Sequence, residues 1–263
     1  MFMAIRWAKR IENLSDITQA KEQGFQIVQL PVEAIMKLDQ SDFREIKQSL
    51  LRTGLSFEVF ESPLPEGVST TERGFNIYSW IEYLKETIAR IAALGCKTLV
   101  WGDGKARILP EDGEVTAIKE NFNQFLFMLA EIAEKYGIVF CLEPLGPRET
   151  NFLNSMKEVV GVINSIGKKN LAIMISSNDI AEIGTNASEI DFYRNLIAHT
   201  YLNFPREAQR QACKEPAFRY SPDIQNYIPF FSILKKIAYD KVIALPSMAD
   251  SQMLMACKDA WAE

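Results

Sequence analysis

The sequence predicts one closed (β/α)8 barrel that spans residues 1–263. Short apolar or β-branched runs alternate along the chain with amphipathic helical patterns, and about eight such pairs fit into its 263 residues. A closed barrel of eight strand–helix units usually needs about 250 residues. With 48% hydrophobic and 24% charged residues, the chain has the composition of a globular domain with a sizeable core.

Eight segments read as buried strands because they are apolar on both faces, which is typical of parallel sheets that helices cover. In chain order they are Met3–Ala8, Phe25–Leu30, Ser56–Glu61, Thr98–Gly102, Val139–Glu143, Leu171–Ser176, His199–Phe204 and Val242–Leu245.

Helical patterns separate these strands. SWIEYLKETIARIAALG repeats apolar residues three or four positions apart and ends at Gly95, and NFNQFLFMLAEIAEKYG does the same and ends at Gly137. SMKEVVGVINSIG begins with Ser155 and has Glu158 three residues later, which is the pattern of a capping box.

An open, doubly wound sheet is the alternative that strand–helix alternation leaves. It usually has fewer units, and no Gly-x-Gly-x-x-Gly follows the first strand. WGDGKAR after the fourth strand contains Gly-x-Gly but no third glycine, so it is a weak dinucleotide signal. The closed barrel is therefore favoured.

Charge and composition exclude several classes of partner. The formal net charge is −5, with 29 Lys and Arg against 34 Asp and Glu, so no basic excess attracts nucleic acid. No apolar run approaches the ~20 residues of a membrane span, and no secretory signal is visible. The four cysteines have no C-x-x-C spacing. We expect a cytoplasmic protein that contacts neither nucleic acid nor membrane.

In a barrel, function belongs to the loops that follow the carboxyl ends of the strands. Three of these loops are rich in polar residues: Trp101–Pro110, Cys141–Asn154 and His199–Arg206. Together they resemble the xylose-isomerase-like sugar isomerase and epimerase family, which includes relatives of endonuclease IV. The most specific piece is Glu143-Pro-Leu, followed by Glu149-Thr-Asn-Phe and Asn154.

The resemblance implies proton abstraction next to a carbonyl, with a divalent metal polarising that carbonyl. The family holds its metal with Glu, Asp, His and Glu after strands five, six, seven and eight. Glu143 stands at the first of these positions, and Glu149 matches the substrate-binding glutamate six residues later. Both are the candidate catalytic residues.

The other metal positions depart from the family pattern. Ser176 stands where the family has Asp, Tyr201 where it has His, and Leu245 or Pro246 where it has the last Glu. The whole chain contains one histidine. We therefore expect no metal, unless Glu143, Glu149 and Asp179 rebuild a weaker oxygen-only site for Mn, Co, Mg or Zn.

Eight residues are candidates to bind the substrate, and each has a plainer alternative role. Trp101 could stack on a sugar ring, but a tryptophan at a barrel rim needs no ligand to explain it. Lys105, Arg107 and Arg206 suit an anionic group of a ligand, but also a solvated loop. Asp179 suits a helix N-cap and His199 a hydrogen-bonded core position. The full set is Trp101, Lys105, Arg107, Asn154, Asp179, His199, Tyr201 and Arg206.

The resemblance implies a divergent protein of carbohydrate metabolism that isomerises or epimerises a small sugar or sugar phosphate. The sequence leaves open whether it turns over its ligand. The alternative is an inactive pseudoenzyme that binds a sugar or a partner protein, and the loss of several metal ligands favours it. Phosphodiester hydrolysis needs a multi-metal cluster, which a single histidine argues against. Barrels of this family often pair, so a homo-oligomer is also an expectation.

Overall fold

Eight parallel strands close into a barrel in chain order. The computed structural model describes residues 5–111, 114–203 and 224–263. The strands are β1 (Arg6–Arg10), β2 (Ile27–Pro31), β3 (Ser56–Glu61), β4 (Thr98–Trp101), β5 (Val139–Leu142), β6 (Leu171–Ser176), β7 (Ile197–Tyr201) and β8 (Val242–Leu245). The pairing of β1 with β8 closes the ring, which confirms the predicted fold class.

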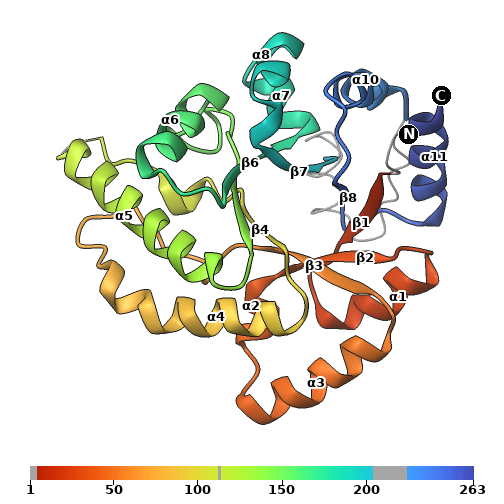
Figure 1. Cartoon of the computed structure of the whole chain (residues 1–263), viewed down its shortest axis with the longest axis horizontal. Coiled ribbons are helices and arrows are strands. Elements are labelled where there is room, and N and C mark those ends of the chain that lie inside the picture. Colours follow the sequence, from red (N-terminus) through yellow and green to blue (C-terminus); the bar gives the residue numbers. More distant parts are fainter. Residues whose placement is uncertain (1–4, 112–113, 204–223) are drawn as a thin grey trace.

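The helices surround the strands on the outside (Figure 1). They are α1 (Ile17–Glu22), α2 (Val32–Met36), α3 (Gln40–Arg52), α4 (Ile81–Ala93), α5 (Val115–Glu134), α6 (Met156–Ile166), α7 (Ser177–Glu182), α8 (Ala187–Phe192), α10 (Ile228–Lys236) and α11 (Ser251–Ala262). Within the described ranges, no helix is long and apolar enough to cross a membrane.

Three helices follow their predicted signals closely. Gly95 and Gly137 lie just after α4 and α5 with φ of 99° and 66°, conformations that favour glycine. At the start of α6, the Ser155 hydroxyl accepts a hydrogen bond from the Glu158 amide at 3.2 Å. Such caps satisfy amides that have no partner within the helix.

Five strands differ by one to three residues from their predicted bounds, namely β1, β2, β4, β5 and β7. β1 continues to Arg10, two residues beyond the predicted end at Ala8, and β7 begins at Ile197, two residues before the predicted start at His199. The apolar pattern ends where charged residues begin, but Arg10 still pairs with Gln29 of β2. A charged residue can therefore end a barrel strand when its side chain reaches a cavity at the mouth.

Apolar side chains form two cores. The larger one lies between the strands and the surrounding helices, and it contains residues such as Leu99, Phe140 and Ile173. A smaller one fills the barrel itself with Ala8, Ile27, Val59, Val100, Cys141, Ala172, Met174, Val242 and Ala244. Residues in strands alternate between the two faces, so neighbours in one strand belong to different cores. The inner core leaves the carboxyl ends of the strands free for polar side chains.

Candidate functional site

A polar cavity of about 260 Å3 lies at the carboxyl ends of the barrel strands. Arg10, Glu61 and Tyr201 are the last residues of β1, β3 and β7, and Glu143 directly follows β5. All four belong to alternate strands, as expected for one layer of side chains in a barrel interior. The complete lining is Arg10, Gln29, Glu61, Ser62, Val100, Gly102, Asp103, Glu143, Met174 and Tyr201.

A chain of hydrogen bonds joins four side chains beside this cavity. Arg10 donates through Nε to Oε1 of Glu61 at 2.9 Å, and its Nη2 lies 2.8 Å from the same oxygen. Gln29 donates through Nε2 to the other Glu61 oxygen at 2.6 Å. The Oε1 atom of Gln29 lies 2.9 Å from Nε2 of His199. The charged side chains of Arg10 and Glu61 at the strand ends are thus held in place by the buried side chains of Gln29 and His199.

The chain of hydrogen bonds also fixes the tautomer of His199. Because a carboxylate only accepts hydrogen bonds, Gln29 must turn its NH2 group to Glu61 and its carbonyl to His199. His199 therefore carries its proton on Nε2. Burial lowers the pKa of His199 to about 3, so the ring is neutral near pH 7. The Glu61 carboxylate raises the pKa of Arg10, which stays charged.

Glu143 reaches the cavity because Gly102 has no side chain. A Cβ added at Gly102 would lie 2.0 Å from Oε2 of Glu143. Residue Glu143 as a whole is buried. Its main chain is also held, since its amide donates to the Trp101 carbonyl at 3.2 Å and its carbonyl accepts from Nη2 of Arg107. The loops after β4 and β5 thus fix this carboxylate together.

Ser62 follows β3 in a left-handed conformation with φ of 60°. Its amide donates to the Val100 carbonyl at 2.9 Å. A residue other than glycine rarely adopts this conformation, and such strain is found most often at functional sites. The turn directs the chain away from the barrel at the edge of the cavity.

Arg107 and Lys105 do not line the cavity. Arg107 is fully buried, and its guanidinium contacts the main chain of Glu143. Lys105 is exposed in a short 3-10 helix, η3 (Lys105–Arg107), whose first amides donate to Oδ1 of Asp103. The Arg107 guanidinium contacts the main chain at the barrel rim, so a contact with an anionic ligand stays a prediction. Asp103, in the same loop, does line the cavity.

Trp101 lies in the core outside the barrel. Its ring stacks on Phe122 of α5 at 5.8 Å with 22° between the planes, and only 1% of the residue is exposed. Since Gly102 faces the cavity, the preceding residue faces the helices. The ring thus packs against α5 and does not line the cavity, and its stacking on a sugar stays a prediction.

Asn154 and Glu149 shape the loop after β5. The side-chain Nδ2 of Asn154 donates to the main-chain carbonyls of Leu145 and Thr150, and these two bonds hold the loop in a folded conformation. Asn154 does not line the cavity. The Glu149 carbonyl lies against Gly104, where an added Cβ would be 2.6 Å away. Glu149 is half-buried and is likewise not among the residues that line the cavity.

His199 and Tyr201 lie on the same strand but differ in access. His199 is 1% exposed and contacts the cavity only through Gln29. The ring of Tyr201 lines the cavity, with the Arg10 guanidinium 5.8 Å from its centroid. Two further predicted residues, Arg206 and the side chain of Asp179, lie outside what the structure describes.

The side chains at the family's metal positions do not fit a divalent ion. Ser176 is fully buried, and Tyr201 offers a phenol in place of an imidazole. Leu245 packs in the outer core, and Pro246, which directly follows β8, has no side-chain group that can bind a metal. No group of three or more His, Cys, Asp or Glu that could hold a metal occurs in residues 5–111, 114–203 and 224–263. A divalent ion needs several oxygen or nitrogen donors, and Glu143 alone supplies a family ligand here.

Several cavity residues were not predicted from the sequence, namely Arg10, Gln29, Glu61, Ser62 and Asp103. A signal existed for two of them, because Arg10 and Glu61 are charged residues that end apolar runs, as Glu143 is. Gln29 and Asp103 gave no comparable signal.

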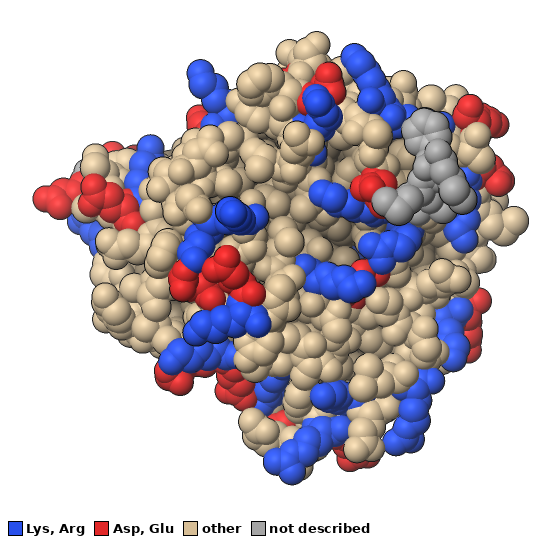
Figure 2. All heavy atoms as spheres, in the orientation of Figure 1, with Lys and Arg blue, Asp and Glu red and all other residues tan. Residues whose placement is uncertain are grey.

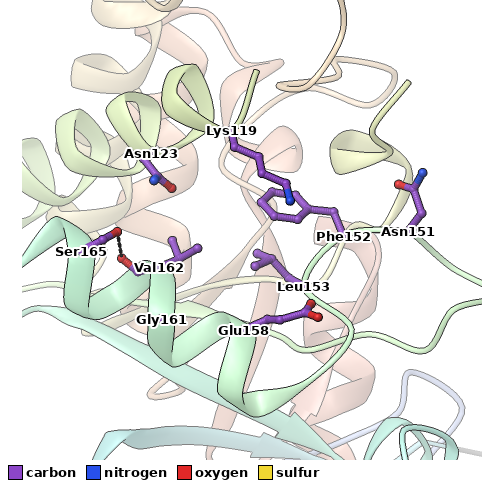
Figure 3. Close-up of a pocket in the computed structure, with 9 residues that line it drawn as sticks. All are labelled: Lys119, Asn123, Asn151, Phe152, Leu153, Glu158, Gly161, Val162 and Ser165. Carbon is purple, nitrogen blue, oxygen red and sulfur yellow. Dashed lines mark hydrogen bonds between the residues drawn. The ribbon is translucent and has the colours of Figure 1, made fainter. Parts of the chain in front are cut away.

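A second depression, of about 340 Å3, lies on the outside between α5 and α6 (Figure 3). Lys119 and Asn123 project from α5, opposite Glu158 and Val162 of α6. The Lys119 ammonium lies 5.2 Å from the centre of the Phe152 ring. No strand end reaches this depression, so the barrel mouth is the better candidate for chemistry.

Comparison with known proteins agrees with the barrel fold. The model of the xylose isomerase-like TIM barrel family matches residues 17–253. D-psicose 3-epimerase from Clostridium cellulolyticum H10, solved with D-tagatose, is 13% identical with a TM-score of 0.74, covering 98% of this chain and 97% of that one. The 3-keto-D-glucoside 4-epimerase of E. coli is 15% identical with a TM-score of 0.70, covering 98% of both chains.

A dehydratase has the same fold. The probable 3-DHS dehydratase of petrobactin synthesis from Bacillus anthracis is 13% identical with a TM-score of 0.72, covering 98% of this chain and 99% of that one. At these identities the likeness shows the fold alone. No curated protein matches the sequence.

Proposed function

The chain belongs to the xylose isomerase-like TIM barrel family, and from this premise we propose that it isomerises or epimerises a small, uncharged sugar. The similar structures include epimerases of D-psicose and of a 3-keto-D-glucoside. The proposed reaction is the transfer of a proton next to the sugar carbonyl.

One observation carries this proposal: Glu143 presents its carboxylate to a polar cavity at the carboxyl ends of the strands. A general base must reach the proton that it removes, and its neighbours must hold the substrate in that geometry. Arg107 and Trp101 fix the main chain of Glu143 through both its carbonyl and its amide. This rigid support is what a proton-transfer base requires.

The proposed step needs no external reagent. The Glu143 carboxylate takes a proton from the carbon next to the carbonyl, and the electron pair of that C–H bond forms a C=C bond. The carbonyl π electrons move to oxygen and give an enolate. Return of the proton to the former carbonyl carbon, with transfer of the neighbouring hydroxyl proton to the former carbonyl oxygen, isomerises the sugar. Delivery of a proton from water to the opposite face of the same carbon, with release of the first proton from Glu143 to solvent, epimerises it.

The names of the similar structures favour a neutral ligand. They refer to D-psicose, D-tagatose and a 3-keto-D-glucoside, which carry no phosphate. Among the described residues that line the cavity, the Arg10 guanidinium pairs with Glu61. On the face drawn in Figure 2, Lys and Arg are interspersed with Asp and Glu. We therefore propose a free sugar in preference to a sugar phosphate.

Exchange of the substrate proton with solvent tests the proposal. D-fructose, D-tagatose and D-fructose 6-phosphate are incubated with the protein in D2O, and loss of the proton next to the carbonyl is followed by NMR. We expect exchange with a free sugar and little with the phosphate. Glu143→Gln should slow exchange by about 100-fold or more, which is typical for loss of a general base.

Glu149→Gln is the matched control, because this glutamate lies on the same loop but does not line the cavity. It should leave exchange within about 3-fold of the wild type. Equal effects of the two variants, or exchange that survives in Glu143→Gln, would contradict the assignment of Glu143.

The second candidate is a sugar-binding protein without turnover. The residues in place of the family's metal ligands favour it, namely Ser176, Tyr201, and Leu245 or Pro246. It predicts that a sugar raises the melting temperature while no proton exchanges. The same samples distinguish the two candidates, since only the enzyme incorporates deuterium.

A further inference from the structure

Arg10 supplies a fixed positive charge inside the cavity. Its Nε and Nη2 atoms both bind the Oε1 atom of Glu61. A guanidinium has five N–H donors, and in the part of the chain that the structure describes the Nη1 atom of Arg10 has no hydrogen-bond acceptor. The side chain keeps 39% of its surface exposed, in the cavity that it lines.

Contacts with Glu61 and Tyr201 hold this guanidinium in one orientation. Glu61 is fixed from behind by Gln29, and Gln29 by the fully buried His199. The Tyr201 ring covers one side of the guanidinium. A preorganised donor of this kind loses little free energy to reorientation when charge develops on a substrate.

Arg10 and Glu143 face each other across the barrel. β1 and β5 are four strands apart in a closed ring of eight, so their inner side chains approach the cavity from opposite sides. A small ligand between them would have a base on one side and N–H donors on the other. Proton transfer next to a carbonyl needs this arrangement, because negative charge moves from the C–H bond to the carbonyl oxygen.

We propose that Arg10 binds the carbonyl oxygen of the sugar and stabilises the enolate charge, the task that a divalent metal has elsewhere in the family. This inference rests on the proposed function of Glu143. As the Glu143 carboxylate takes the proton, the N–H groups of Arg10 donate hydrogen bonds to the oxygen that gains the electron pair. Arg10 keeps its own protons throughout, so atoms and charge balance.

The chain itself contains a matched control. Arg6 lies on the same strand and forms an ion pair with Glu58 of β3, as Arg10 does with Glu61. Arg6 lies at the opposite end of the barrel and does not line the cavity. Arg6→Met therefore removes a comparable ion pair without touching the proposed site.

The test measures D-fructose and D-tagatose binding by calorimetry and proton exchange by NMR, with and without EDTA. Arg10→Met should lower the exchange rate by about 100- to 1000-fold, the usual effect of losing an oxyanion donor. Arg10→Lys retains the charge but lacks the rigid fork of the guanidinium that orients donors toward Glu61 and a substrate oxygen at once, so it should lose about 10-fold. Arg6→Met should exchange as the wild type does, and EDTA should have no effect.

Four outcomes would overturn the inference. The first is an exchange rate of Arg10→Met within 3-fold of the wild-type rate, and the second is an equal loss of exchange in Arg6→Met. The third is a wild type that loses exchange in EDTA and recovers it in Mn2+ or Co2+. The fourth is a wild type that binds no sugar. If Arg10→Met does not fold, Arg10→Lys decides, because wild-type exchange in that variant would contradict the role. A wild type that binds sugar without proton exchange contradicts the proposed function of Glu143. In that case the sugar affinity of Arg10→Met decides about Arg10. Unchanged affinity contradicts this inference as well, whereas affinity weakened by about 10-fold or more supports the contact of Arg10 with the carbonyl oxygen.

Discussion

Mild acid should destabilise the protein through its single histidine. His199 is buried in a neutral form whose pKa is lowered by burial from 6.5 to about 3. The unfolded chain takes up a proton as the pH falls through 6.5, whereas the folded chain does not until about pH 3. The stability that neutral His199 contributes is therefore complete above pH 6.5 and is lost as the pH falls from 6.5 towards 3.

The size of this effect follows from the difference between the two pKa values. Each pH unit below the unfolded value costs about 1.4 kcal/mol of the free energy of unfolding for one proton. At pH 5.0 the loss is about 2 kcal/mol, a sizeable part of the 5–15 kcal/mol by which domains are usually stable.

Urea unfolding of the wild type and of His199→Gln at pH 7.5 and pH 5.0 measures this loss. Glutamine retains an N–H donor that can reach Gln29 but does not titrate. Other titrating groups are common to both proteins, so they cancel in the comparison. We expect the stability advantage of the wild type over the variant to shrink by about 2 kcal/mol between the two pH values. An unchanged advantage, or an NMR titration of the native ring near pH 6.5, would refute the reasoning.

Three further substitutions test the geometry of the cavity. Gly102→Ala would place a methyl group 2.0 Å from the Glu143 carboxylate, so proton exchange by NMR should fall by about 10-fold or more as that carboxylate moves. Ser62→Gly should raise the free energy of unfolding in urea by about 0.5–1 kcal/mol, because it relieves a left-handed conformation; a decrease would show that the serine contributes a contact of greater value. Leu153 has almost the same φ, 62°, but is 1% exposed, so Leu153→Gly should lower stability by about 2–4 kcal/mol in the same assay.

The fold could be predicted from the sequence because its signals are local. Apolar strand runs, amphipathic helices and the capping pattern of Ser155 and Glu158 each involve residues close together in the chain. The strand bounds were least accurate where charge interrupts the apolar pattern, as at Arg10. A strand end in a barrel mouth can carry charge because the cavity, and not the core, receives the side chain.

Part of the cavity lining could be located from the sequence. Glu143 and Tyr201, two of the candidate residues, line it, and for Glu143 the signal was a carboxylate after an apolar run, which needs a special environment. Trp101 lies in the outer core, because strand residues alternate between two faces and the sequence alone did not settle which face it occupies. The bond between Gln29 and His199 joins residues 170 positions apart. Only closure of the barrel brings them together, so no local pattern could predict it.

Apart from Asp103, which follows β4, the charged side chains of the cavity come from the segments of odd-numbered strands. Arg10 and Glu61 end β1 and β3, and Glu143 directly follows β5, whereas the uncharged Gly102 and Met174 come from the segments of β4 and β6. A change at Met174 would alter the room for a ligand without removing any charged group. Variation at Met174 would thus retune ligand choice while Arg10, Glu61 and Glu143 keep the same chemistry.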